Sequence, residues 1–391
     1  MNQVKNGKSK TDRNAFETQT SQTKRIHEYN GHEQRCTLIT GGAGFIGTNL
    51  AHRLLSQGCP VIIFDNLSRA GVEKNLVWLM ETYGGLVQVE IGDIRNKETV
   101  QKVVNRASQV FHLAAQVAVT TSLVNPIYDF EVNAQGTLYL LEALRALGDN
   151  APPLLFTSTN KVYGALDDVK LTEKNTRYQP EDLAVRTDGI SETRPVEFHS
   201  PYGCSKGTAE QYVLDYARTF NLPAAVFRMS CIYGEHQFGT EDQGWVAHFL
   251  IRVIEGKPLT LYGDGKQVRD VLYVGDLVDA FLLAQKNMEK ISGQAFNIGG
   301  GAANAVSLLE LIDLIGEMHG ESFATIFSDW RHADQKYYVS NTSKFEAETG
   351  WEARIDVSEG VEKLYRWLLE SRKMPVSSFT EIKQNQTAFP V

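Results

Sequence analysis

The segment CTLITGGAGFIGTNLAHRLL, residues 36–55, decides the predicted fold, because it joins a short apolar strand, a glycine-rich turn and an amphipathic helix. Its first spaced glycine allows a tight turn, the second lets the backbone approach a pyrophosphate, and the third lets the helix pack closely on the strand. We therefore predict a dinucleotide site at this turn. The contacts predicted there are Gly41, Gly44, Phe45, Ile46 and Gly47.

The next apolar strand ends in an acidic residue, in the segment VIIFDNLSR at residues 61–69. Asp65 stands where a carboxylate accepts hydrogen bonds from both hydroxyls of an adenosine ribose, and it would repel a 2′-phosphate. Arg69 could partly reverse that preference, so we expect NAD in preference to NADP. Further cofactor contacts are predicted at Asn66, Ser68 and Arg69.

Outward from this segment, short apolar runs alternate with longer segments of helical period. Expected strands lie at 36–40, 60–64, 86–91, 109–113, 153–157 and 224–229, and the clearest helices at 45–57, 133–147 and 205–220. Continuous apolar strands are typical of a parallel sheet that is buried on both faces. We predict a doubly wound α/β (Rossmann) fold with a smaller α+β lobe for the substrate.

The expected domain organisation follows the change in pattern near residue 233, where the elements become shorter and mixed. It comprises a polar tail at 1–34, the cofactor-binding domain at 35–233, a lobe at 234–372 that mainly binds substrate, and a second tail at 373–391. The chain is free to cross between the lobes, so the boundary at residue 233 is soft.

Composition narrows the class of partner. The 391 residues carry a net charge of −8, which argues against a broad basic surface for nucleic acid or acidic lipid. No stretch reaches the roughly twenty apolar residues that span a bilayer, and the first 34 residues lack the apolar segment of a secretory signal. The four cysteines have no paired spacing, so we expect neither disulfides nor zinc and favour a reducing cytoplasm.

Catalytic candidates lie in HSPYGCSKGTAEQYVLDYA, residues 199–217. Tyr202 and Lys206 are four residues apart on an expected helix, so their side chains share one face. A tyrosine with an ordinary pKa of about 10 is a poor base at neutral pH, and we expect a nearby ammonium and a positively charged nicotinamide to lower that pKa. Tyr-x-x-x-Lys also recurs by chance, so this pair gains weight only beside the dinucleotide motif and Thr159.

Several short motifs together resemble the extended short-chain dehydrogenase/reductases that act on nucleotide sugars. They are TGGAGFIG (40–47), GDIR (92–95), HLAA (112–115), VNAQGT (132–137), VYG (162–164), YGCSK (202–206) and GDGKQVRDVLYVGDL (263–277). The resemblance spans about residues 36–369 and implies bound NAD and a homodimer or homotetramer. It also implies that Asp93 and Ile94 lie near the adenine, that Leu113, Ala114 and Ala115 line the cofactor, and that Thr159, Tyr202 and Lys206 form the catalytic trio.

The stretch FTSTNKVYG, residues 156–164, bears on the reaction. Related 4,6-dehydratases carry Asp-Glu after the catalytic threonine, whereas this chain has Asn160 and Lys161. An amide cannot protonate a leaving hydroxyl, so dehydration is disfavoured. Within the family, STNKVYG, SCIYG and DQGWV resemble most the enzymes that invert C2 of a CDP-linked 3,6-dideoxyhexose through a transient 2-keto sugar.

Two alternatives stay open: 4-epimerisation of a UDP-linked or other nucleotide sugar, and a regulator that binds NAD or a nucleotide sugar without turnover. In 4-epimerases the position of Cys231 usually carries asparagine. An intact trio argues against the regulator.

Substrate contacts are predicted at Asn160, Lys161, Arg269 and Arg331. An arginine matches phosphate with a fork of donors, so Arg269 and Arg331 are the expected anchors of the diphosphate; surface salt bridges are the alternative. The polar insertion at 165–198 is either a substrate lid or a solvated insertion.

His112 and His199 are interpreted as structural, and no metal is expected. The helices at 133–147 and 207–220 have apolar faces that suit either an interface between subunits or the core.

Overall fold

The computed structural model describes residues 35–320, 323–331 and 334–372; the predicted tails at 1–34 and 373–391 lie outside the described residues. The strands are β1 (Cys36–Thr40), β2 (Val61–Asp65), β3 (Val87–Ile91), β4 (Ala107–His112), β5 (Leu154–Thr159), β6 (Leu171–Glu173), β7 (Tyr178–Pro180), β8 (Ala224–Met229), β9 (Cys231–Tyr233), β10 (Leu259–Tyr262), β11 (Val268–Tyr273), β12 (Ala295–Ile298), β13 (Ala305–Ser307), β14 (Thr325–Ser328) and β15 (Tyr337–Tyr338).

The helices are α1 (Phe45–Ser56), α2 (Val72–Tyr83), α3 (Lys97–Val104), α4 (Val119–Val124), α5 (Pro126–Phe130), α6 (Gly136–Arg145), α7 (Leu183–Asp188), α8 (Ser200–Phe220), α9 (Trp245–Ile254), α10 (Val274–Lys286), α11 (Met288–Ile291), α12 (Leu308–His319), α13 (Ser343–Thr349) and α14 (Val357–Ser371). Short 3₁₀ segments occur at Gly84–Leu86, Gly148–Asn150, Asn160–Tyr163 and Ala302–Asn304, and a π-helical turn, η2, at Glu131–Gln135.

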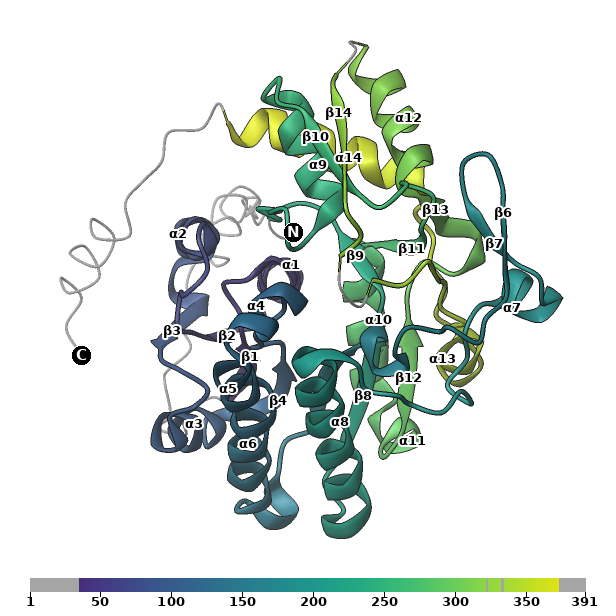
Figure 1. The fold of residues 1–391 in the computed structure, drawn as a ribbon. Coiled ribbons are helices and arrows are strands. Elements are labelled where there is room, and N and C mark those ends of the chain that lie inside the picture. Colours follow the sequence, from purple (N-terminus) through teal and green to yellow (C-terminus); the bar gives the residue numbers. More distant parts are fainter. Residues whose placement is uncertain (1–34, 321–322, 332–333, 373–391) are drawn as a thin grey trace, which may run out of the picture. The chain divides into compact units, whose positions relative to one another are not determined.

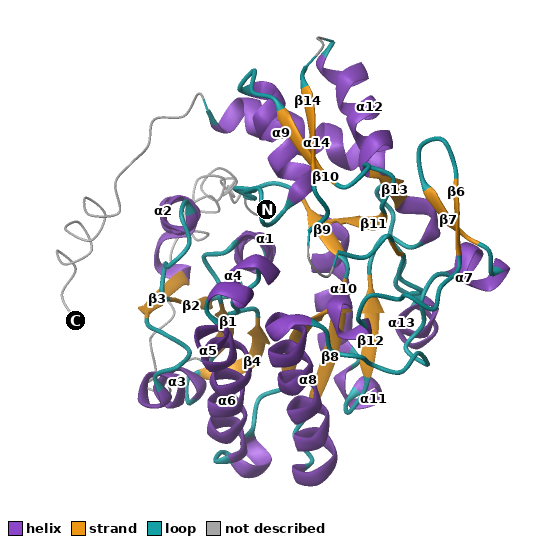
Figure 2. Ribbon diagram, in the orientation of Figure 1, coloured by secondary structure: helices purple, strands orange, loops and turns teal. Residues whose placement is uncertain are grey.

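A seven-stranded sheet in the order β12-β8-β5-β4-β1-β2-β3 forms the centre of the fold, and every pair of neighbours is parallel (Figure 2). The doubly wound α/β prediction is confirmed, and each expected strand joins this sheet. The seventh strand, β12, comes from beyond residue 233. The chain thus returns to the sheet after that point, and the division into lobes at residue 233 stays a prediction.

Neighbouring residues of each strand face opposite sides of the sheet, and both sides are apolar. Leu38 and Val110 pack in a core that includes α3, α6 and α8, whereas Ile39 and Phe111 pack in a core that includes α1, α2 and α10. Figure 1 shows α6 and α8 running side by side. Burying each such side chain stabilises the fold by about 1.5–3 kcal/mol, which explains why the strands are continuously apolar.

The order of the strands reverses between β1 and β4, whose neighbours β2 and β5 lie on opposite sides. Ligands of doubly wound sheets bind in the crevice at such a switch point, beyond the carboxyl ends of the strands. The glycine turn follows β1, and Leu113 follows β4. The topology therefore brings two of the predicted cofactor segments together.

The long helix α8 carries two of the catalytic candidates. It begins with Pro201 in its first turn, where a missing N–H is harmless. It ends at Asn221, whose φ of 55° is left-handed and stops the helix. The catalytic segment thus occupies the first turns of the helix, beside the carboxyl end of β5.

A second set of elements follows residue 230. β11 pairs with β9, β13 and β15, while β10 pairs with β14. α9, α12 and α14 pack with these strands in a separate apolar core around Phe249, Leu311 and Leu364. No helix in the described part of the chain is both long and apolar enough to cross a membrane.

The insertion at 165–198 contains the antiparallel hairpin β6–β7 and the short helix α7. Tyr178 in the hairpin donates its backbone N–H to the carbonyl of Lys266, and Ile190 donates to the carbonyl of Val339. The insertion is therefore joined to the segments around Lys266 and Val339, and the choice between a lid and a solvated insertion stays open.

Candidate active site

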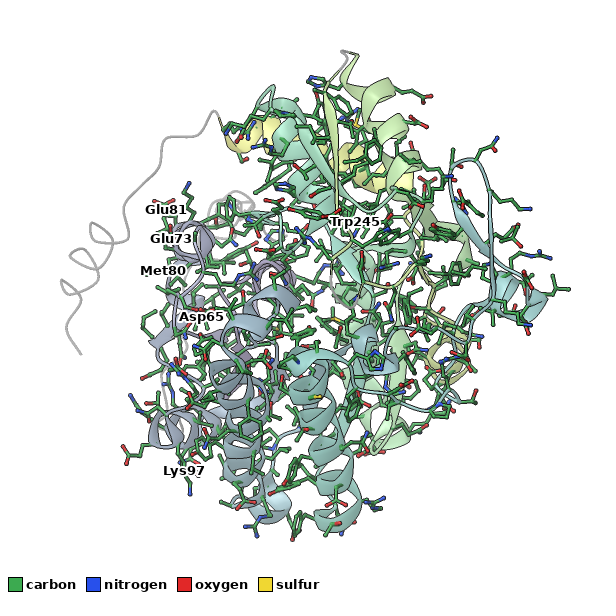
Figure 3. All side chains as sticks on the ribbon, in the orientation of Figure 1. Asp65, Glu73, Met80, Glu81, Lys97 and Trp245 are labelled. Carbon is green, nitrogen blue, oxygen red and sulfur yellow. The ribbon has the colours of Figure 1, made fainter. Side chains whose placement is uncertain are left out.

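A cavity of about 560 Å³ lies at the carboxyl ends of the central strands and extends to β11 and α9. Figure 3 shows two of its lining residues, Asp65 at the end of β2 and Trp245 at the start of α9, well apart in the molecule. All the predicted cofactor, catalytic and substrate residues line this cavity except Asp93. Its size suits a cofactor with part of a substrate.

The glycine turn has no room for side chains. Gly41 has a φ of 69°, and a Cβ built on it would lie 2.7 Å from the backbone nitrogen of Ala114. A Cβ on Gly47 would lie 2.5 Å from the carbonyl oxygen of Gly41. The turn therefore exposes backbone at the N-terminus of α1, which is the arrangement that receives a pyrophosphate.

Asp65 is fixed by two backbone amides. Its Oδ1 accepts from the N–H of Leu67 at 2.8 Å, and its Oδ2 accepts from the N–H of Ala43 at 3.1 Å. Burial raises the pKa of this carboxyl, while these hydrogen bonds and the charge of Arg69 lower it. The carboxylate is thus held beside the glycine turn, and together they fit the ribose and diphosphate of NAD.

Asp93 itself is not among the residues that line the cavity. Its carboxylate accepts from Arg95 at 2.9 and 3.0 Å and from Asn66 at 2.9 Å. The hydrogen bond from Arg95 is the largest reason why its pKa falls to about 2. Its neighbours Gly92 and Ile94 and its partner Asn66 all line the cavity, so the placement of Asp93 near the adenine stays a prediction.

Tyr202 and Lys206 both lie on the buried face of α8 and are 8% and 3% exposed. The side chain of Thr159, at the end of β5, lies near Tyr202 and lowers its pKa. The Nζ of Lys206 donates to the carbonyl of Thr157 at 2.6 Å and lies 4.3 Å from the ring centre of Phe156. The structure thus brings the three catalytic candidates together.

Their electrostatics correct one expectation. Burial raises the pKa of Tyr202 to about 12, which outweighs the lowering by Thr159, and the charge of Asp129 raises it further. Burial also lowers the pKa of Lys206 to about 7, against the opposing charges of Asp129 and Glu210. The expected lowering by Lys206 is therefore not supplied by the protein's own groups, because the sequence pattern does not reveal how deeply the pair is buried.

Asn160 belongs to a chain of hydrogen bonds behind Thr159. Its Oδ1 accepts from the hydroxyl of Thr159 at 3.3 Å, and its Nδ2 donates to the Oε1 of Gln335 at 3.3 Å. Gln335 in turn donates to the carbonyl of Gly164 at 2.6 Å. The amide thus holds the hydroxyl of Thr159, a catalytic candidate, and Gln335 is a residue that no sequence motif indicated.

Lys161 and Arg269 meet at one carboxylate. The Nζ of Lys161 is 3.7 Å from an oxygen of Asp334, and an Nη of Arg269 is 2.7 Å from the same oxygen. Arg269 also donates to the carbonyls of Val268 and Gln335. The guanidinium donors of Arg269 are therefore largely used in bonds within the protein, as the salt-bridge alternative predicts.

Arg331 is more available to an anion. It lies 3.7 Å and 3.9 Å from single oxygens of Asp242 and Glu241, with its guanidinium 3.9 Å from the ring centre of Tyr262. Both ion pairs are long, no hydrogen bond of its guanidinium to another described residue is found, and Arg331 lines the cavity. It is the better placed of the two predicted anchors.

Glutamines missed by the sequence analysis complete the far end of the cavity. Buried Oε1 atoms of Gln237, Gln243 and Gln267 have no hydrogen-bond partner among the described residues, and all three side chains line the cavity. Unpaired buried acceptors of this kind suit a ligand that carries hydroxyl or amino donors. Gln243 and Trp245 belong to the DQGWV segment, which was the available signal.

His112 is buried between two hydroxyls, with Nδ1 2.6 Å from Thr40 Oγ1 and Nε2 2.9 Å from Thr137 Oγ1. His199 is hydrogen-bonded to Glu197, at 3.0 Å. Within the described ranges, no group of three or more His, Cys, Asp or Glu side chains could hold a metal ion.

The comparisons with known proteins agree with this geometry. Residues 37–299 match the model of the NAD dependent epimerase/dehydratase family. The chain is 46% identical over 337 residues to CDP-paratose 2-epimerase of Salmonella typhi, a match that covers 84% of this chain and 98% of the relative.

Solved structures agree as well. UDP-glucose 4-epimerase of Thermus thermophilus in complex with NAD has a TM-score of 0.71 and 30% identity, covering 85% of this chain and 98% of that one. UDP-glucuronic acid 4-epimerase from Bacillus cereus in complex with UDP-glucuronic acid and NAD has a TM-score of 0.72 and 28% identity, covering 86% and 99%. The chain belongs to the NAD dependent epimerase/dehydratase family.

Proposed function

We propose that this chain is an NAD-dependent isomerase that inverts C2 of a CDP-linked 3,6-dideoxyhexose, interconverting CDP-paratose and CDP-tyvelose. The observation that carries the proposal is the placement of Thr159, Tyr202 and Lys206 in the same cavity as the glycine turn. A hydroxyl oxidised beside that trio can be reduced again there, because a cofactor held by the turn and by Asp65 stays with the protein.

Bound NAD supplies the hydride acceptor and donor, together with a positive ring charge that favours ionised Tyr202. The Oη of Tyr202 takes the proton from the C2 hydroxyl and returns it after the keto sugar has presented its other face. Thr159 shares the reacting oxygen with Tyr202, while Asn160 holds the threonine hydroxyl in place.

Anchoring of the remote diphosphate lets the sugar turn without leaving. Arg331 is the principal anchor. Arg269 forms an ion pair with Asp334, which Lys161 also approaches, and so holds these residues at the cavity wall. Binding energy from the nucleotide thus confines the keto sugar while the sugar ring itself is gripped loosely.

The choice of C2 and of CDP is supported by the Salmonella typhi relative, whose match covers nearly its whole length. The absence of an acid at Asn160 and Lys161 agrees with a reaction that loses no water. UDP-sugar 4-epimerisation is the second candidate, supported by the solved 4-epimerases.

A direct test is to incubate the purified full chain with CDP-paratose and follow the sugar by NMR. We expect the C2 epimer to form without added reductant. Inversion at C4 instead, or turnover of UDP-glucose alone, would support the second candidate. Binding of the nucleotide sugar without any turnover would support the regulator.

Assembly and location are part of the proposal. Exposed Tyr212 and Phe220 on α8, with Ile127 and Phe130 on α5, suit a homodimer or homotetramer. The four cysteines form no disulfide within the described ranges, which suits a reducing cytoplasm.

A further inference from the structure

Asp129 is a buried carboxylate that the proposed proton path does not use. It lies on α5 and is 0% exposed. A buried charge is costly unless hydrogen bonds or an opposite charge compensate for it. A carboxylate at this position therefore needs hydrogen-bond donors or a nearby positive charge.

Three neutral side chains donate to this carboxylate. The Oγ of Ser205 donates at 2.5 Å, the Nε2 of Gln116 at 2.7 Å and the Nδ2 of Asn133 at 3.2 Å. Donors to a carboxylate stabilise its ionised form without cancelling its charge. Burial raises the pKa of Asp129, while the hydrogen bonds from Ser205 and Gln116 and the positive charge of Lys206 lower it and favour the carboxylate.

The same bonds join the segments that carry the active site. Ser205 precedes Lys206 on α8, and Gln116 follows Ala115, which lines the cavity. Asn133, in the π-helical turn η2, also accepts from the backbone N–H of Gln116 at 2.9 Å. The position of the catalytic face of α8 relative to the end of β4 therefore depends on Asp129.

Among the groups facing Lys206, Asp129 supplies the least compensated negative charge. Glu210 also acts on Lys206, but it is paired with Arg228 at 2.5 Å. His112 is neutral at physiological pH because burial lowers its pKa to about 3. The remaining neighbours of the ammonium, the carbonyl of Thr157 and the ring of Phe156, carry no net charge.

We propose that Asp129 is a positioning residue for the reaction. Its buried negative charge keeps Lys206 as an ammonium ion and disfavours the ionised form of Tyr202. The inference rests on the proposed function, since it assigns a role within that same site. It adds to Tyr202 and Lys206 a third ionisable group, one that does not contact the substrate.

The variant Asp129→Asn removes the charge and keeps the shape. Without the carboxylate, Lys206 loses its proton at lower pH and Tyr202 ionises at lower pH. Both limbs of the kcat–pH profile should therefore move to lower pH, by about one unit. A merely structural role would lower kcat and leave both limbs where they are.

Ser205→Ala is the matched control, because it removes the 2.5 Å hydrogen bond and keeps the charge. We expect a several-fold lower kcat with unmoved limbs. Limbs that shift equally in both variants, or do not shift in Asp129→Asn, would overturn the inference. Should Asp129→Asn fail to fold, Asp129→Glu, which keeps the charge and changes the shape, should leave both limbs at their wild-type pH, and limbs that move in it would overturn the inference.

A readout independent of turnover separates this inference from the proposed function. In protein labelled with ¹³C at lysine Cε, the Lys206 signal, assigned with Lys206→Arg, should titrate about one pH unit lower in Asp129→Asn. An unshifted midpoint contradicts the inference even where the wild type is active. If the midpoint shifts in Asp129→Asn while the wild type shows no turnover, the inference is supported and the proposed function is rejected.

Discussion

The two ends of the cavity are built by different means. The cofactor end consists of backbone: the glycine turn after β1 meets the end of β4, and Asp65 is held by two amides. The substrate end consists of charged and amide side chains, such as Lys161 against Asp334 and Asn160 against Gln335. At the cofactor end, a Cβ added to a glycine of the turn would clash with backbone atoms. At the substrate end, one side chain can be replaced by another.

This difference suggests how one fold serves many nucleotide sugars. A backbone cradle binds the same dinucleotide regardless of the surrounding sequence. Side chains from segments far apart in sequence can change independently, so they set the substrate. Variants at the two ends should therefore fail in different ways.

The largest effect is expected at the junction of the two ends. Tyr202→Phe should lower kcat by about 10³-fold with little change in KM, because it removes the proton acceptor and almost no volume. Tyr216→Phe is the control, since Tyr216 lies on the same helix but bonds to Glu142. Near-normal activity of Tyr202→Phe would remove the basis of the proposed chemistry.

At the cofactor end, Gly47→Ala forces a Cβ to within 2.5 Å of the carbonyl of Gly41. Overpacking against backbone costs about 1–3 kcal/mol, so we expect the purified variant to retain much less NAD. Retention is measured by denaturing the protein and assaying the supernatant. Gly85→Ala, where a Cβ meets open space, should retain NAD like the wild type; equal retention in both variants contradicts the cradle.

At the substrate end, Arg331→Gln should raise KM for the CDP-sugar about tenfold and leave the bound NAD unchanged, because one charge-assisted hydrogen bond is worth about 1.5–3 kcal/mol. Arg354→Gln is the control, since Arg354 is exposed and pairs loosely with Glu352 at 4.0 Å. A loss of NAD with no change in KM would place Arg331 at the other end of the cavity.

The smallest effect is expected at Cys231, which lines the cavity, as Trp245 does. Cys231→Ser keeps a hydrogen-bonding group, so kcat/KM should change by no more than about threefold. A loss of a hundredfold or more would assign Cys231 a direct part in the reaction and would blur the distinction between the two ends.

The sequence predicts the cofactor end well, because its determinants are local. Strand, glycine turn, helix and acid follow one another within residues 36–65, and their spacing fixes their geometry. The substrate end depends on contacts across 175 residues between Asn160 and Gln335, which no spacing rule reveals.

Two other features could not be predicted from the sequence, for physical reasons. The pKa of Tyr202 depends on how deeply its side chain is buried, whereas periodicity indicates only whether a helix face is apolar or polar. Asp129 precedes the recognised motif VNAQGT, but its role depends on the fold bringing Gln116 and Ser205 to it. Local propensity predicts elements, whereas the charge environment requires the assembled core.

The claim of oxidation and reduction at C2 is tested most directly with CDP-paratose that carries deuterium at C2. In ordinary water, we expect a C2 epimer that keeps the deuterium at C2, because the hydrogen never exchanges with solvent. Loss of the label to water would indicate proton abstraction at C2. Either that loss, or a product inverted at C4 with the C2 configuration unchanged, would rule out oxidation and reduction at C2.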